Sequence, residues 1–172
     1  YSVRLVSLRV EMDDTPTVPP SILDSLHELE SLKTEHQLAA VGVALQDWRL
    51  GPRLQQSSKV DFFKLWNGPT ILRHPPEMLN WLAELAAMQV PVISAGVFHG
   101  GFLVGGSAMD GRSISPNTSA NQSLIAWRKS FAALCLGHGV RPAHACIQFS
   151  LRTPGVVAAS LSTSHVDRVA EN

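Results

Sequence analysis

Apolar runs typical of buried strands alternate along this chain with segments whose apolar residues recur at helical spacing. Residues 38–45 read LAAVGVAL, a nearly continuous apolar run of the kind that forms a strand buried on both faces. A helical segment follows Pro19-Pro20, with Ile22, Leu26 and Leu29 on one stripe. Strands that alternate with helices predict βαβ units on a parallel sheet, with right-handed crossovers that place the helices outside.

The same patterns give the expected order of elements. Strands are expected at residues 3–10, 38–45, 60–65, 90–95 and 156–161. Helices are expected at residues 20–36, 76–89, 121–136 and 142–152, with a last helix after Ser164 or His165. Asp47 is expected to cap a short helix, and a glycine-rich loop is expected from residue 96 to about residue 120.

Two architectures fit about five strand–helix pairs. A doubly wound sheet would be complete at 172 residues, whereas a (β/α)8 barrel needs about 250 residues, so the chain would be its last five units. The composition is globular, with 45% hydrophobic and 16% charged residues, and does not choose between them. The first strand is not followed by GxGxxG, which weakens the dinucleotide-binding form of the open sheet.

Charge, cysteine and histidine usage exclude several classes of protein. Fourteen basic residues balance fourteen acidic ones, whereas a general nucleic-acid binder needs a basic face. No apolar run reaches the roughly 20 residues that span a bilayer. Cys135 and Cys146 fall on expected helices and are predicted to be buried free thiols, and the histidines show no ligand spacing, so no metal site is expected. Reduced thiols without a secretory signal favour a cytoplasmic protein.

Four stretches together are similar to a known family. They are VGVALQDW at 41–48, AGVFHGGFLVGG at 95–106, AHACIQFSL at 143–151 and SLSTSHVDRVAEN at 160–172. In this order and spacing they resemble the aldo-keto reductases, especially the D-threo-aldose (L-fucose) 1-dehydrogenase branch. These proteins are (β/α)8 TIM barrels that bind NADP or NAD across the carboxyl end of the barrel. The resemblance implies one partial domain over residues 1–172, an incomplete barrel from the fourth strand to the start of the last helix.

The last stretch implies a clamp for the adenosine side of the cofactor. By resemblance, Thr163 and Arg168 meet the adenosine-side phosphate, and Glu171 and Asn172 hold the adenine, with Ser162 also expected to bind the cofactor. The spacing agrees, because Arg168 and the Glu171-Asn172 pair share one helix face and arginine offers a fork for phosphate. Ser162 stands where the family often has lysine, which favours NAD or mixed use. An ordinary exposed helix start with an Arg–Glu pair is the alternative.

The glycine-rich loop follows a strand and so lies on the face where barrel enzymes carry their chemistry. Glycine lets the backbone approach a ligand closely. The resemblance places this loop beside the pyrophosphate and nicotinamide, with Phe98, His99, Gly101 and Leu103 as the expected cofactor-binding residues. A plain flexible connector is the alternative.

The substrate side departs from the family pattern. Family catalysis uses a tyrosine, a lysine, an aspartate and a histidine, and the first three would precede Tyr1. The histidine position carries Arg9, which cannot share a proton as imidazole does, and the tyrosine after the third strand aligns with Pro69. No catalytic residue is therefore expected within this chain.

Three hypotheses follow. In the first, the chain supplies the adenosine/phosphate clamp and part of the substrate wall of an NAD(P)-dependent oxidoreductase acting on a sugar or small carbonyl compound, without turning over alone. In the second, it is a non-catalytic binding or regulatory protein on a degenerate reductase scaffold. In the third, it is a complete small open-sheet protein. A barrel fragment would leave residues 3–10 and 156–161 as open sheet edges. No nucleic-acid or membrane partner is expected, and the oligomeric state is left open.

Overall fold

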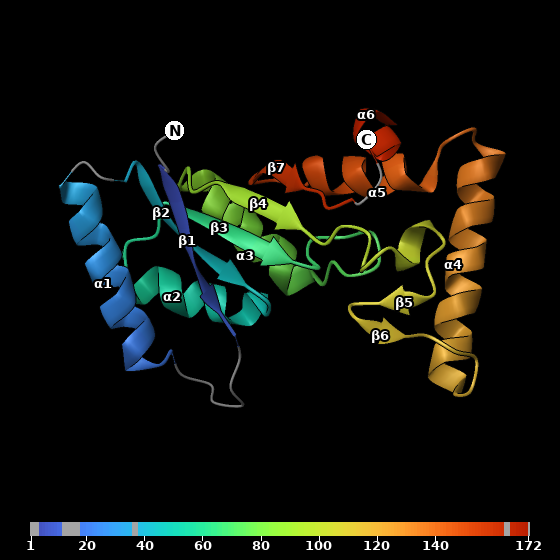
Figure 1. Ribbon diagram of the computed structural model, residues 1–172, viewed down its shortest axis with the longest axis horizontal. Helices are drawn as coiled ribbons and strands as arrows, with labels where there is room; N and C mark the ends of the chain where they lie inside the picture. Colours follow the sequence, from blue (N-terminus) through green and yellow to red (C-terminus); the bar gives the residue numbers. More distant parts are fainter. Residues whose placement is uncertain (1–3, 12–17, 36–37, 164–165, 172) are drawn as a thin grey trace.

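A five-stranded parallel sheet forms the centre of the computed structural model, which describes residues 4–11, 18–35, 38–163 and 166–171 (Figure 1). The strands lie in the order β1-β2-β3-β4-β7, so β1 and β7 are the two edges. Their bounds are β1 Leu5–Val10, β2 Ala40–Leu45, β3 Phe62–Trp66, β4 Val92–Ala95 and β7 Val156–Ser160. The expected α/β fold of a parallel sheet with alternating helices is confirmed, as are both open edges.

Helices follow the strands along the chain. The larger ones are α1 Pro20–Thr34, α2 Gly51–Ser57, α3 Pro76–Ala87, α4 Ser119–Gly137, α5 Pro142–Leu151 and α6 Val166–Glu171. A short 3₁₀ helix, η1, spans Trp48–Leu50, and the backbone N–H of Arg49 donates to the Asp47 carboxylate, which confirms that cap. In Figure 1, α4 lies at the opposite end of the molecule from α1, and α5 lies between β7 and α4.

The main core lies between the sheet and the helices that follow β1, β2 and β3. Alternate residues of β2 and β3, such as Val43 and Phe63, point to these helices and are 0% exposed. Leu82 of α3 meets them and is also 0% exposed. The helix expected at residues 76–89 ends at Ala87, and Met88 lies beyond it with 59% of its surface exposed. Met78 and Trp81 are the other large buried side chains that α3 contributes beside its leucines.

A second core lies under the segment that the sequence indicated as a flexible loop. Residues 96–118 contain the 3₁₀ helix η2 (Phe102–Val104) and a hairpin of β5 (Ala108–Met109) and β6 (Arg112–Ser113). Phe102 and Leu103 pack against α4 and α5 residues Phe131 and Cys146. The expectation of a plain loop is therefore corrected, because its apolar side chains build a core of their own.

An ion pair fastens α1 to the start of β3. Lys33 donates to both carboxylate oxygens of Asp61 at 2.7 Å, and Asp61 also accepts the backbone N–H of Val41 at 2.8 Å. The hydrogen bond with Asp61 is the main cause that raises the pKa of Lys33 above its ordinary value of 10.5. One carboxylate thus connects a helix and two strands.

We expect Lys33→Met to lower the free energy of unfolding by about 1 kcal/mol at neutral pH, since the pair is only partly buried. The raised pKa means that the folded state favours charged Lys33. The ion pair therefore contributes its full stabilisation below pH 10.5, and this stabilisation is lost as the pH rises through the higher pKa that Lys33 has in the folded state. Urea unfolding of wild type and variant from pH 7 to 11 measures this. A gap that widens above pH 10.5 would contradict the account.

Both cysteines are buried free thiols, as predicted. Burial raises the pKa of Cys135 and raises that of Cys146 to about 12. Because the thiolate is the reactive form, we expect iodoacetamide to leave Cys146 unmodified for hours at pH 8 in the folded protein and to modify both cysteines in urea. Intact-mass and peptide mass spectrometry distinguish the two sites. Rapid alkylation of Cys146 in the folded protein would contradict its burial.

Candidate functional site

One large cleft lies where the parallel strands end. Its volume is about 1110 Å³, and its walls are formed by residues that follow β2, β3, β4 and β7, by the β5–β6 turn and by the start of α5. Ligands of α/β proteins bind at this end of the strands, because the loops that follow parallel strands converge there. The residues that line the cleft include Gln46, Trp66, Asn67, Phe98, Gly101, Asp110, Arg141, Ser162 and Thr163.

The glycine-rich segment turns sharply along one wall of this cleft. Gly96 has φ +70°, and a Cβ there would lie 2.4 Å from Asn67 Oδ1, so only glycine fits between the β3 and β4 ends. Gly101 has φ +92°, and nothing lies within 4 Å of the place where its Cβ would be. The backbone at Gly101 therefore faces open space, and a ligand can approach it closely.

A buried histidine is hydrogen-bonded to two other segments of this wall. His99 is 1% exposed, and its Nε2 lies 2.8 Å from the Oγ1 of Thr70, which follows β3. Its Nδ1 lies 3.1 Å from Asp110 Oδ2 at the tip of the β5–β6 hairpin. Asp110 lines the cleft with 23% of its side chain exposed. The imidazole thus connects the loops after β3 and β4 with the hairpin, behind the surface of the cleft.

The structure brings together some of the residues predicted to bind the cofactor. Phe98, Gly101, Ser162 and Thr163 line the same cleft, although about sixty positions separate the two pairs in the sequence. His99 and Leu103 lie just behind the wall, each 1% exposed.

The other predicted positions lie at the margins. Arg168 and Glu171 are residues of α6, the helix that comes after β7 in the sequence. Asn172 lies outside the described residues. Arg9 is in β1, where it forms an ion pair of 2.9 Å with Glu11.

Several lining residues were missed by sequence reasoning. Gln46 and Asn67 come directly after β2 and β3, and that position alone is a signal, since the carboxyl ends of parallel strands share one edge. Asp110-Gly111 is the two-residue turn of the hairpin, and Asp-Gly is a strong sequence signal for such a turn. Arg141 precedes α5 and bonds to His144, one turn into that helix.

The cleft contains charges of both signs. Arg141 supplies a cation at the start of α5, whereas Asp110 supplies a carboxylate from the hairpin and is hydrogen-bonded to His99. Within the described residues no three His, Cys, Asp or Glu side chains are placed to hold a metal ion. No described helix is long and apolar enough to cross a bilayer.

Comparison with known proteins gives the family. The model of the Aldo/keto reductase family matches residues 9–172. No curated protein sequence matches the chain. Among solved structures, the holo form of an aldo-keto reductase from Bacillus halodurans superposes with a TM-score of 0.70 at 19% identity, covering 98% of this chain and 53% of that one.

Two further structures have the same fold. A glycerol dehydrogenase from Gluconobacter oxydans gives a TM-score of 0.60 at 14% identity, covering 99% of this chain and 57% of its own. A thermostable aldo-keto reductase in complex with the inhibitor epalrestat gives 0.61 at 14% identity, covering 99% and 52%. This chain thus spans about half the length of the barrels it matches.

Proposed function

Because the chain belongs to the aldo/keto reductase family, we propose that its cleft is the cofactor-binding part of an NAD(P)-dependent oxidoreductase site. The observation that carries this proposal is the convergence of Phe98, Gly101, Ser162 and Thr163 on one cleft at the carboxyl end of the sheet. The family and the fold rest on the comparisons with known proteins. The activity, the substrate and the cofactor are what we propose.

The residues present fit a dinucleotide. A cleft of about 1110 Å³ exceeds the usual volume of a site for a drug-sized ligand, which is roughly 300–1,000 Å³. Gly101 leaves its Cβ space open, so that the extended middle of the cofactor can lie against the backbone. Arg141 offers a positive charge and Ser162 and Thr163 offer exposed hydroxyls, which suit phosphate oxygens.

Roles follow for the predicted residues. We assign Phe98 and Gly101 to the pyrophosphate and nicotinamide side, with His99 and Leu103 holding that wall from behind. We assign Ser162, Thr163 and Arg168 to the adenosine-side phosphate, and Glu171 and Asn172 to the adenine. A serine at 162 cannot neutralise a 2′-phosphate as a lysine would, so NADH is expected to bind at least as well as NADPH.

The substrate is a sugar or another small carbonyl compound, in the manner of the D-threo-aldose (L-fucose) 1-dehydrogenase branch that the sequence resembles. The nicotinamide, when bound, supplies the hydride acceptor or donor for that carbon. The chain's own residues at the cleft mouth, including Trp66 and Gln46, would form part of the substrate wall.

Titration with NADH and NADPH tests the proposal. The fluorescence of the four tryptophans is followed, because Trp66 lines the cleft. Saturable quenching by either cofactor, lost in Trp66→Phe but not in Trp127→Phe on α4, is the expected result. Well-folded protein that gives no saturable change with either cofactor, by fluorescence and by calorimetry, would overturn the cofactor site.

One observation favours the second hypothesis, a binding protein without turnover. Arg9, the next-to-last residue of β1, is exposed and forms an ion pair with Glu11, and a guanidinium cannot move a proton near neutral pH. Ligand binding would then persist without reduction of any carbonyl compound in a protein that carries the rest of the barrel. Cofactor oxidation by that protein, measured at 340 nm, decides between the two.

A further inference from the structure

We propose that Lys64 and Arg9, on the sheet face that opens to the cleft, bind the anionic group of a sugar-sized carbonyl compound. This inference rests on the proposed function and names the substrate class: an acidic sugar or keto compound bearing a carboxylate or phosphate, rather than a neutral sugar. It is carried by the register of three strands and by the surroundings of Lys64.

The register places the two cations in one row. Arg9 of β1 pairs with Ala44 of β2, and Ala44 pairs with Lys64 of β3. Neighbours in a parallel sheet point to the same face, and strands lie about 4.8 Å apart, so the two cationic side chains begin about 10 Å from each other. Ala44 between them has only a methyl group. Ala44 itself is 6% exposed, and Arg9 and Lys64 flank it on the two neighbouring strands.

This row lies on the face away from the main core. Val43 and Leu45, on either side of Ala44, are 0% exposed and pack in the main core against the helices. Because side chains alternate along a strand, Ala44 and Lys64 point to the opposite face. The residue in register with Lys64 on β4 is Ile93, whose partner on β7 is Ala158. None of these partners is acidic.

Lys64 forms no ion pair with any described residue. Lys64 is half-buried, and its Nζ lies 5.6 Å from the centroid of the Trp66 ring. Among the described residues the ion pairs join Arg9, Lys33, Arg49 and His99 to carboxylates, and none involves Lys64. A partly desolvated ammonium without a counter-charge is costly, and a bound anion would remove that cost.

Arg9 can be released to a ligand. Its partner Glu11 is 67% exposed and Arg9 itself 58%, and an exposed pair of this kind is worth only about 0–1 kcal/mol. A ligand carboxylate or phosphate could offer the guanidinium a two-point contact in place of this single ion pair.

The row is continuous with the cleft. Trp66 follows Lys64 by two residues, so it lies on the same face about 6.6 Å farther along the strand, and it lines the cleft with 42% of its surface exposed. A compound whose carbonyl end lies in the cleft can therefore extend its other end past Trp66 to Lys64. That geometry fits a chain of about five or six carbons with the anionic group opposite the carbonyl.

Three probes with one carbon skeleton test the proposal: D-glucuronate, D-glucose 6-phosphate and D-glucose. Binding to this chain is measured by calorimetry in 20 mM and 200 mM salt. We expect at least one acidic probe to bind about tenfold or more tightly than glucose, with a preference that weakens at high salt. The better acidic probe identifies carboxylate or phosphate as the natural group, and either result supports the proposal.

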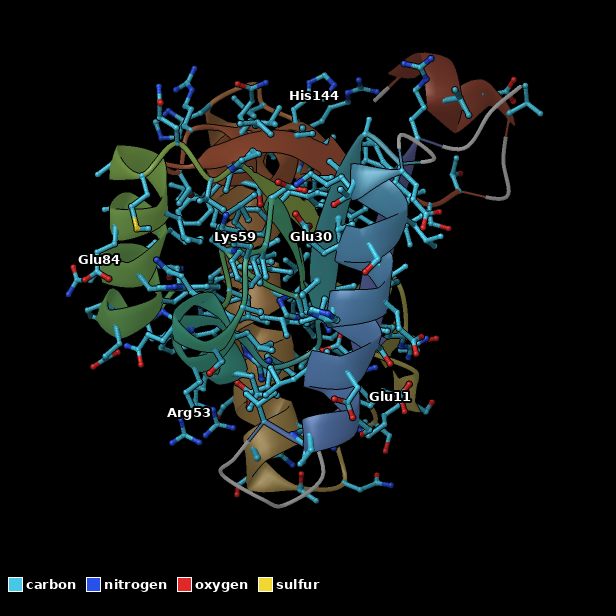
Figure 2. The ribbon with its side chains drawn as sticks, turned by 90° about the vertical axis from the view of Figure 1, so that its left-hand side faces the viewer. Glu11, Glu30, Arg53, Lys59, Glu84 and His144 are labelled. Carbon is cyan, nitrogen blue, oxygen red and sulfur yellow. The ribbon has the colours of Figure 1, made fainter. Side chains whose placement is uncertain are left out.

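Variants locate the effect. Lys64→Met is expected to lower the affinity for the better acidic probe about tenfold, and Arg9→Gln to lower it less, because Arg9 is more exposed. Lys59→Met is the matched control, because it removes the same charge from an exposed residue just before β3 (Figure 2). Lys59 lies at the end of that strand away from the cleft, so this variant should leave binding of the probe unchanged. Where Lys64→Met unfolds, Lys64→Gln replaces it, with thermal unfolding as the check.

Two results would overturn the proposal: the three probes bind equally or not at all, or Lys64→Met and Lys59→Met bind the acidic probe alike. NADH titration of the same samples separates this failure from that of the proposed function. Cofactor binding without an anion preference rejects only the acidic substrate. Loss of cofactor binding in wild type rejects the oxidoreductase site itself.

Discussion

Phe63→Ala is expected to lower the free energy of unfolding by about 3–5 kcal/mol, the largest loss of any single substitution considered for this chain. The Phe63 side chain is 0% exposed at the centre of β3, and its ring meets Trp81 of α3 edge-on at 5.2 Å between centroids. Removing the ring leaves a cavity between sheet and helix that close-packed neighbours cannot fill. Such a loss is a large part of the 5–15 kcal/mol by which domains are ordinarily stable.

Urea unfolding followed by circular dichroism measures this effect. Val157→Ala on the edge strand β7 is the control, since Val157 is 65% exposed and its truncation should change the stability by no more than about 0.5 kcal/mol. If Phe63→Ala cost less than about 1 kcal/mol, the packing of β3 on α3 would not be the main core.

Gly101→Leu is expected to weaken NADH binding at least tenfold, or by about 1.4 kcal/mol or more. Gly101 lines the cleft, and the space where its Cβ would stand is empty within 4 Å, so a leucine would occupy the place proposed for the extended middle of the cofactor. The left-handed backbone at φ +92° also disfavours leucine, which costs stability of about 1–2 kcal/mol.

Gly105→Leu separates these two effects. Gly105 has φ +105° and likewise nothing within 4 Å of a Cβ, so the backbone cost is alike, but it does not line the cleft. We expect similar losses of stability in both variants and loss of NADH affinity only in Gly101→Leu. If the two variants had equal affinities for NADH, Gly101 would not be part of the cofactor site.

Hydrophobic pattern was sufficient to predict the sheet. The run at 38–45 predicted a strand buried on both faces, and five of the six residues of β2 are buried. Pro76 at the first turn of α3 gave the start of that helix correctly. Strand burial and helix starts can be predicted because each depends on the types of a few residues that are adjacent in the sequence.

The segment after β4 could not be predicted in the same way. Its glycines suggested a plain loop, while Phe102 and Leu103 are buried by packing against α4 and α5, which lie later in the chain. The Asp110-Gly111 turn was visible in the sequence, but strands of two residues are too short to show alternation. Only tertiary contacts decide that such a segment forms a hairpin.

The candidate site was predicted in part for the same reason. Ser162 and Thr163 were identified by a motif, and their position in one cleft with Phe98 and Gly101 follows from β4 and β7 being neighbours in the sheet. The row from Arg9 to Lys64 depends on strand register across β2, which no pattern within either strand reveals. His99 was expected to contact the cofactor, whereas its ring nitrogens are hydrogen-bonded to Thr70 and Asp110.

Amide chemical-shift mapping of this 18.6 kDa chain with NADH tests the central claim most directly. The account predicts saturable shifts confined to the cleft, at the amides of Phe98, Gly100, Gly101, Ser162 and Thr163, with none in α1. Saturable shifts that gather away from the carboxyl ends of the strands, or a spectrum unchanged at millimolar NADH, would contradict it.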